Sequence, residues 1–184
     1  MIKACFDVKK WSKVGKSGDF FVTLSSKRHS IISTHVRFLG NIEAKADAKG
    51  RVFLPAAFRK VLQGEGVEQL VMRKDVHEEC LVLYPESVWN ELMDGMRARL
   101  NRWNRVQQQI FRQFVSDVEL ITLDASGRIL ISKRFKEMAG IEQAVRFIGV
   151  GDTIEIWAVK AEEEPFVDAE TFGSALEELM NDMN

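Results

Sequence analysis

The sequence predicts a strand-rich α+β fold built from two copies of one small unit, on the strength of three observations. The phrase DAKGRVFL at 47–54 recurs 77 positions later as DASGRILI at 124–131. Each copy follows a segment with the apolar–polar alternation typical of a half-buried strand. A long helical pattern separates the two copies. Because repeats reveal how a chain is organised, we expect similar units at 41–88 and 117–160, joined by a helical connector at 89–116.

The first repeat is predicted to contain a hairpin, a helix and two further strands. The expected elements are strands at 42–46 and 51–54, a helix at 56–63, and strands at 69–73 and 80–84. Asp47 begins the hairpin turn and Gly50 ends it, as a turn with one left-handed residue and a bulge requires. Pro55 suits the first turn of the helix, and Gly64 is expected to end it.

The second repeat copies this order. The expected elements are strands at 118–123 and 128–131, a helix reaching 139, and a strand at 154–157. Ser132 is a candidate helix cap and Gly140 a candidate helix end. The glycines of 149–151 lack the third glycine of a dinucleotide fingerprint, so we interpret them as a turn between strands.

The connector is predicted to form two helices with a break near 101–104. Its apolar residues recur at spacings of three, four and seven, which gives an apolar stripe. Trp89 and Trp103 are candidates for exposed subunit contacts. Five arginines have no acid among them: Arg97, Arg99, Arg102, Arg105 and Arg112. A solvated face or a subunit contact is the favoured interpretation of these arginines, and a phosphate-facing patch is the alternative.

Composition places the chain among globular proteins. Of its 184 residues, 46% are hydrophobic, and no apolar run approaches the roughly 20 residues that span a bilayer. Lysines interrupt each apolar stretch near the N-terminus, unlike a secretory signal. Cys5 and Cys80 are far apart and predict neither a disulfide framework nor a zinc site. We therefore expect a cytoplasmic protein without a membrane segment.

The net charge of −1 conceals strong segregation along the chain. Residues 1–35 carry a net charge of +5, residues 36–160 carry +2, and residues 161–184 carry −8. A near-neutral total argues against a strongly basic coat but leaves room for a local basic face. We expect 161–184 to be an acidic tail with a short helix near 169–183.

Residues 1–35 show no helical period, and we expect them to be poorly ordered. The duplicated part begins just after them, with VRFLG at 36–40. Valine can be encoded by GTG, an alternative bacterial start codon. Our hypothesis is that translation begins at Val36, which the intact mass of the natively expressed protein would test.

Catalysis finds little support in the sequence. None of the three histidines has a partner at the spacing of a metal site or a catalytic triad. Motifs of serine hydrolases, zinc proteases and P-loop enzymes are missing. Asp47 and Asp124 each precede an arginine by four residues, which should lower the aspartate pKa and leave a poor general acid. We expect a protein that is not an enzyme and uses no metal, cofactor or small-molecule substrate.

Binding is better supported. In a tight hairpin, an aspartate can accept hydrogen bonds from the N–H groups of the turn and also hold the following arginine. Arg51 and Arg128 would then present planar forks suited to phosphate or to the edge of guanine. Lys45 and Lys49 add positive charge near the first loop. The alternative is that each Asp–Arg pair only braces its own hairpin.

These motifs resemble the MraZ family. The resemblance covers about residues 36–160 and is carried by three motifs: DAKGRV at 47–52 after FLG at 38–40, LVLYP at 81–85, and the second D-x-x-G-R at 124–128. MraZ proteins are bacterial transcription regulators built from two AbrB-like (SpoVT-AbrB, swapped-hairpin) units. The resemblance implies that the hairpins of the two repeats interleave into one intrachain pseudo-dimeric β-barrel with flanking helices.

The resemblance also implies a function. It predicts ring-shaped homo-oligomers, associated with the nucleoid, whose D-x-x-x-R loops face double-stranded DNA. The expected target is a set of short direct repeats upstream of the division and cell-wall gene cluster, including the protein's own gene. A ring-forming, antitoxin-like interaction module that acts through its acidic tail is the alternative.

By position, the resemblance makes Arg51 and Arg128 DNA contacts with Asp47 and Asp124 beside them, and it places Lys49 at the family's basic loop position. From the residues themselves, we add Lys45 as a fourth candidate DNA contact for its charge, and Gly50 and Gly127 as residues that position the loops with the two aspartates. The second loop departs from the pattern because Ser126 stands where the first has Lys49, and no proline matches Pro55. We therefore expect the first loop to supply more of the attraction for phosphate.

Overall fold

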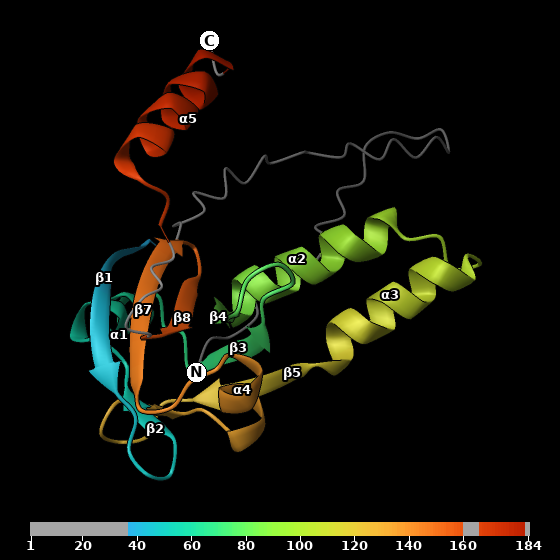
Figure 1. Ribbon diagram of the computed structural model, residues 1–184. Coiled ribbons are helices and arrows are strands. Elements are labelled where there is room, and N and C mark those ends of the chain that lie inside the picture. The colour runs from blue at the N-terminus through green and yellow to red at the C-terminus, as the bar shows by residue number, and fades with distance from the viewer. Residues whose placement is uncertain (1–36, 160–165, 183–184) are drawn as a thin grey trace, which may run out of the picture. The chain divides into compact units, whose positions relative to one another are not determined.

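The computed structural model describes residues 37–159 and 166–182 (Figure 1). The expected N-terminal extension, the hypothetical start at Val36 and part of the acidic tail lie outside these residues. The first repeat contains β1 (Phe38–Lys45), β2 (Arg51–Phe53), α1 (Ala56–Gly64), β3 (Gln69–Lys74) and β4 (Cys80–Pro85). Two helices follow, α2 (Glu86–Arg99) and α3 (Arg105–Ser116). The remaining elements are β5 (Val118–Thr122), β6 (Arg128–Leu130), α4 (Lys133–Met138), β7 (Ala144–Gly151), β8 (Ile154–Ala158) and α5 (Ala169–Asp182).

The two repeats share one order of elements, strand–strand–helix–strand–strand, and the α+β class is confirmed. Six strands form one antiparallel sheet in the order β1-β7-β8-β4-β3-β5, and β2 pairs separately with β6. The equivalent strands of the two repeats are β1 and β5, β3 and β7, and β4 and β8. Exchanging each strand for its equivalent gives the same order read from the other edge of the sheet. The sheet therefore has a pseudo-twofold axis at its centre, where β4 pairs with β8.

Strand pairing joins the two repeats throughout. The first strand of each repeat has its partner in the other repeat, since β1 pairs with β7 and β5 pairs with β3. The ribbon formed by β2 and β6 is also shared, with Val52 opposite Ile129 at its centre. Neither repeat could complete its hydrogen bonding alone, because the strand edges of each are satisfied by the other.

The expected closed barrel is wrong in detail. β1 and β5 form the two edges of the six-stranded sheet, and the β2–β6 ribbon is a separate two-stranded sheet. β1 meets β2 only through one isolated bridge, between Ala46 and Val52. A strand of three residues makes too few ladder bonds to close the sheet. Side-chain packing, in place of a continuous ladder of backbone hydrogen bonds, holds the ribbon against the sheet.

The hydrophobic core lies between the large sheet, the ribbon and the two short helices. Val52 and Ile129 contribute the inward face of the ribbon and are fully buried. Phe58 of α1 and Phe135 of α4 occupy equivalent positions in the two repeats, and both are buried. The ring of Phe58 meets Phe38 of β1 edge-on, with centroids 5.7 Å apart. Burial of these large apolar side chains is the main stabilising contribution.

Three local predictions need correction. α1 continues through Gly64, and Gly66, at φ 66°, provides the left-handed residue that follows it. Ser132 precedes α4, but its side chain makes no capping hydrogen bond. Gly149 and Gly151 lie inside β7, and the turn comes after them. Gly140, at φ 61°, follows α4 as predicted.

The connector forms two helices with a break between them, as predicted, and the two helices fold back on each other as a hairpin. Figure 1 shows α2 and α3 side by side, joined by the break at 101–104. Trp89 is only 9% exposed, contrary to expectation, because it stacks on Phe114 of α3 with ring centroids 5.7 Å apart. The guanidinium carbon of the buried Arg73, in β3, lies 3.8 Å from the centroid of the Phe114 ring. These aromatic contacts attach the hairpin to the sheet, while Trp103 at its tip is 95% exposed.

Gly149 marks the closest approach of β1 and β7. A Cβ atom at this position would lie 2.4 Å from the carbonyl carbon of Phe38 and 2.6 Å from the nitrogen of Leu39. Both are backbone atoms, so no side-chain rotation can relieve the overlap. Glycine is therefore required here by strand spacing.

We predict that Gly149→Ala lowers the free energy of unfolding by about 1–3 kcal/mol, the usual cost of overpacking. Gly95→Ala is the matched control, because Gly95 lies inside α2 with nothing within 4 Å of its added Cβ. The control should raise stability by about 0.5–1 kcal/mol, since alanine favours helix. Urea unfolding followed by circular dichroism measures both. Equal midpoints for the two variants would contradict the close approach.

Candidate nucleic-acid interface

The first D-x-x-G-R phrase forms a tight loop, here called loop 1 (residues 47–50), organised by one carboxylate. Asp47 Oδ1 accepts hydrogen bonds from the backbone N–H of Lys49 at 2.9 Å and of Arg51 at 3.0 Å. Asp47 Oδ2 accepts from Arg51 Nε at 2.7 Å and lies 2.7 Å from Arg51 Nη2. Gly50 adopts the left-handed backbone, at φ 82°, that ends the turn. The aspartate thus fixes both the loop backbone and the arginine side chain.

The second phrase forms loop 2 (residues 124–127) with the same contacts. Asp124 Oδ1 accepts from the N–H groups of Ser126 at 2.8 Å and Arg128 at 3.0 Å. Asp124 Oδ2 accepts from Arg128 Nε at 2.7 Å. Gly127 has φ 80°. The aspartate–arginine contacts expected from the sequence are therefore present in both loops, with nearly equal distances.

Both aspartates are ionised at neutral pH. The backbone hydrogen bond from Arg51, followed by that from its side chain, lowers the pKa of Asp47 to about 2. The backbone hydrogen bond from Arg128 likewise lowers the pKa of Asp124. A carboxylate so strongly held as an anion cannot serve as a general acid. Its role in the loop is to accept hydrogen bonds.

The two loops are also tied to each other. The N–H of Ile131 donates to the carbonyl of Gly50 at 2.9 Å, and the N–H of Leu54 donates to the carbonyl of Gly127 at 3.1 Å. A Cβ on Gly50 would lie 2.4 Å from the carbonyl oxygen of Ile131. Each loop is therefore anchored to the strand that leaves the other loop, which fixes the distance between them.

The ribbon presents both arginines on one face. Arg51 lies opposite Leu130, and Phe53 lies opposite Arg128. Because side chains alternate along a strand, these four side chains share the outward face. Phe53 is 55% exposed and Leu130 is 49% exposed. The guanidinium of Arg128 lies 5.6 Å from the centroid of the Phe53 ring.

Two basic residues that the sequence analysis missed also lie near the loops. Arg59 of α1 donates from Nε to the carbonyl of Leu54 at 3.0 Å and lies against Gly127 of loop 2. Its equivalent in α4, Lys136, lies near Gly50 of loop 1. Their 77-residue spacing is visible in the sequence. Their placement beside the opposite loop follows only from the pairing of the repeats.

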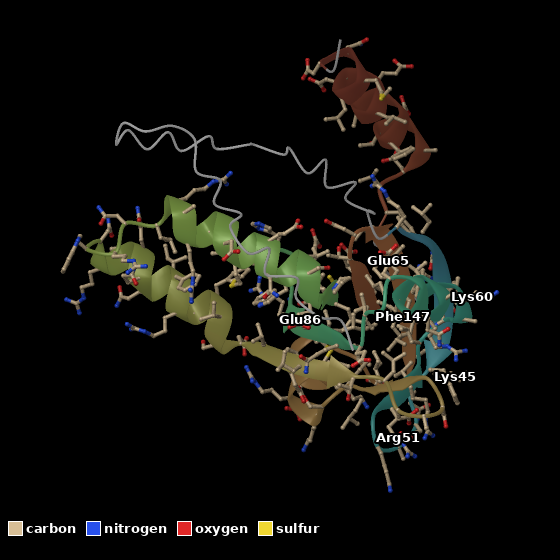
Figure 2. The ribbon with its side chains drawn as sticks, turned by 180° about the vertical axis from the view of Figure 1, so that it is seen from behind. Lys45, Arg51, Lys60, Glu65, Glu86 and Phe147 are labelled. Carbon is tan, nitrogen blue, oxygen red and sulfur yellow. The ribbon has the colours of Figure 1, made fainter. Side chains whose placement is uncertain are left out.

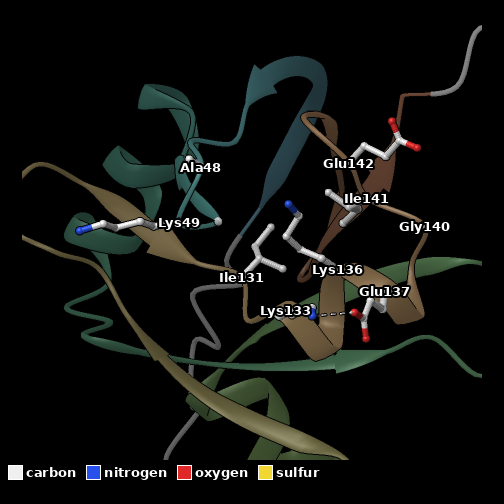
Figure 3. A pocket seen from close by; sticks show the side chains of 10 residues that line it. Ala48, Lys49, Ile131, Lys133, Lys136, Glu137, Gly140, Ile141 and Glu142 are labelled. Atoms are coloured by element: carbon white, nitrogen blue, oxygen red, sulfur yellow. Dashed lines mark ion pairs between the residues drawn. The ribbon is translucent and has the colours of Figure 1, made fainter.

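A shallow groove separates loop 1 from α4 (Figure 3). Lys49 extends away from loop 1 at its rim, and Lys136 extends into it (Figure 3). Lys133 pairs with Glu137 at 3.7 Å on the α4 side. Lys45 is the exposed last residue of β1, two positions before loop 1, and does not belong to the ribbon (Figure 2). Positive charge is therefore concentrated around loop 1.

The arginines of the connector belong to a different element, the α2–α3 hairpin. The guanidinium of Arg97 lies 5.8 Å from the ring centroid of Phe111, and Arg99, Arg105 and Arg112 are exposed. Exposure is what both interpretations, a solvated face and a phosphate-facing patch, predict.

The described residues offer little to a metal ion or a nucleophilic mechanism. Within 37–159 and 166–182, no three potential metal-binding side chains come together. Burial raises the pKa of the Cys80 thiol to about 12, so it remains protonated. Nor does any helix of these residues have the length and apolar character needed to cross a membrane.

Comparison with known proteins gives the family. A family model described as "MraZ protein, putative antitoxin-like" matches residues 38–113 and 114–163. A protein of Bacteroides thetaiotaomicron is 60% identical over 149 residues, covering 81% of this chain and 96% of the relative. A protein of Phocaeicola vulgatus is 61% identical over 149 residues, covering 81% and 97%. A protein of Christiangramia forsetii is 34% identical over 146 residues, covering 79% and 94%.

All three relatives are named "Transcriptional regulator MraZ". The family match falls in two segments that meet between residues 113 and 114, inside α3 and shortly before the second repeat begins. Both D-x-x-G-R loops lie inside the matched segments. With most of its length matched, the chain belongs to the MraZ family.

Proposed function

We propose that this protein is a transcription regulator that binds DNA in a sequence-specific way through the ribbon and its two loops. The observation that carries the proposal is a pair of arginines on one face of the ribbon, Arg51 and Arg128, each held through Nε by the aspartate of its own loop. Family membership and the names of the relatives support it. The protein would act by binding rather than by catalysis.

The ribbon suits DNA in both shape and chemistry. The major groove admits a two-stranded β-ribbon, and arginine forks pair with guanine or phosphate. In loop 1, Asp47 engages Nε and Nη2 of Arg51. The Nη1 donors of that guanidinium are not used by this contact, so they can face a ligand. The aspartate then positions the arginine without using all of its hydrogen-bond donors.

Each predicted site residue has a role in this proposal. Arg51 and Arg128 make the principal contacts, and Lys45 and Lys49 attract phosphate. Asp47, Asp124, Gly50 and Gly127 hold the loops. Loop 1 contributes more attraction than loop 2, because Ser126 stands where loop 1 has Lys49.

We further propose that the chain assembles into a ring-shaped homo-oligomer of swapped-hairpin units on the nucleoid. Its target would be short direct repeats in the promoter of the division and cell-wall gene cluster, including its own gene. Several ribbons on one ring would engage successive repeats, so modest individual contacts add through effective concentration. In this proposal, 41–88 and 117–160 are the binding units and 161–184 is a dispensable tail.

One observation favours a second candidate, an interaction module that acts through its C-terminal helix. Residues 166–182 contain five acids and no base. The described α5 exposes Phe172, Leu176 and Leu179. Spacings of four and three place these side chains on one helical face. An acidic helix with an apolar face is suited to a partner protein, independently of the ribbon.

We predict that Arg51→Ala weakens binding to the promoter duplex by about 1–3 kcal/mol, the usual size of a good bidentate contact. Arg128→Ala should have a similar or smaller effect, and Arg51→Lys should restore charge but not the fork. A fluorescence anisotropy titration at fixed salt measures these affinities.

Arg112→Ala is the matched control, since it removes an exposed arginine from α3. It should leave affinity within twofold of the wild type. Unchanged affinity in Arg51→Ala, with loss in Arg112→Ala, would move the DNA contact to the helical hairpin.

We predict that Asp47 titrates near pH 2 in the folded protein, below its ordinary value of 3.8. A lowered pKa stabilises the native state at pH values above 3.8, and this contribution is lost as pH falls towards 2. Arg51→Ala should raise the pKa only in part, because the backbone N–H of residue 51 still donates to Oδ1. Carbon-13 NMR of the carboxyl group measures the midpoint. A midpoint near 3.8 in the wild type would contradict the hydrogen bonding of loop 1.

We predict that a chain ending at residue 160 keeps the DNA affinity of the full chain or exceeds it slightly. The truncation removes eight acids and no base, which lessens repulsion from phosphate. Gel-shift titrations at two salt concentrations compare the two chains. Loss of binding on truncation would favour the interaction module over the ribbon.

A further inference from the structure

We infer that Phe53 and Leu130 are specificity-determining residues that contact thymine methyl groups in the major groove. The inference rests on the proposed DNA-binding function and deepens it, since it assigns base recognition to apolar side chains beside the arginines.

The two side chains are exposed at equivalent positions of the two repeats. Phe53 follows Arg51 by two residues, and Leu130 follows Arg128 by two. Both remain about half exposed, while Val52 and Ile129 between them are fully buried. Single exposed apolar residues are common on protein surfaces. A symmetric pair on the face that carries both arginines indicates a shared ligand.

The spacing of this face matches that of stacked bases. Residues two apart on one strand are separated by roughly 7 Å, and base pairs are stacked every ~3.4 Å. The arginine and the apolar residue of one strand are therefore placed to meet bases about two steps apart. The pseudo-twofold axis through the pair Val52–Ile129 repeats this arrangement on the other strand of the ribbon.

The chemistry of the two side chains selects thymine. In the major groove, thymine presents a methyl group, whereas the edges of guanine, adenine and cytosine present polar atoms. The side chains of Phe53 and Leu130 have no hydrogen-bond donor or acceptor. Covering a methyl group with them therefore lowers the free energy of binding, whereas covering a polar base edge raises it by desolvation. Preferred sites should thus combine guanine, read by arginine, with thymine about two steps away.

Phe53 has a competing role that Leu130 lacks. Its ring lies 5.6 Å from the guanidinium of Arg128 and could simply hold that arginine in place. A holding role would lower affinity for any duplex, with or without methyl groups. If Phe53 contacts thymine instead, its contribution to affinity depends on whether the duplex carries the methyl group.

The test removes the methyl groups from the DNA. A duplex selected from a random library by the full-length protein is resynthesised with deoxyuridine in place of thymidine, and both forms are titrated by fluorescence anisotropy. Wild-type protein should lose roughly three- to tenfold in affinity, at about three- to fourfold per methyl group covered. Phe53→Ala and Leu130→Ala should bind the thymine duplex more weakly and show a smaller difference between the two duplexes.

Leu120→Ala is the matched control, because Leu120 is 61% exposed on β5 and does not belong to the ribbon. It should keep the full difference between the duplexes. Thermal unfolding of each variant checks its fold. The comparison of the two duplexes with wild-type protein tests the inference even if a variant does not fold.

Three results would overturn the inference while leaving DNA binding intact: equal wild-type affinity for both duplexes, selected sites without thymine, or variants that keep the full difference. A change in oligomer size on Phe53→Ala, with the difference between duplexes retained, would assign the pair to contacts between copies. Failure to select any duplex would instead overturn the proposed function.

Discussion

Hydrogen bonding between the two repeats is the constraint on which the rest of the structure depends. β1 and β5 pair with strands of the opposite repeat, and β2 and β6 pair with each other. A single repeat would leave these strand edges unpaired, at a cost in free energy for each buried polar group. The exchange also places the ribbon on the pseudo-twofold axis. Both loops consequently stand at fixed positions on either side of it, tied by the carbonyls of Gly50 and Gly127.

Within that frame, bracing and binding are not competing roles for the aspartates. A carboxylate that accepts hydrogen bonds from two backbone N–H groups and one guanidinium stiffens the loop, and the same hydrogen bonds lower the pKa of Asp47. The same contact reduces the number of rotamers open to Arg51. An arginine already ordered loses less entropy when it meets a ligand, and preorganisation of this kind favours tight binding. Two loops with matching contacts suggest that this ordering was retained in both copies.

Local signals in the sequence predicted most elements, whereas long-range contacts could not be read from it. The turn at Asp47–Gly50 and its copy follow from residue types that only certain backbone angles accept, so their geometry could be anticipated. The burial of Trp89 could not be predicted, because it depends on Phe114, which stacks on Trp89 only after the hairpin folds back. The prediction of a closed barrel was wrong for a similar reason, because closure depends on how many ladder hydrogen bonds β2 and β6 make. Arg59 was missed because its neighbour, Gly127, belongs to the other repeat.

The pairing of the repeats also changes the ratio of positive charges around the two loops. Loop 1 has Arg51 and Lys49 and receives Lys136 from α4, whereas loop 2 has Arg128 and receives Arg59 from α1. Each loop gains one cation from the other repeat, so the ratio between the loops falls from two to one to three to two, while loop 1 keeps one cation more than loop 2. A true twofold axis would match a palindromic site, because protein symmetry mirrors that of the operator. If the ribbon binds DNA as proposed, its unequal ends would distinguish the two directions along the duplex, which suits direct repeats better than palindromes.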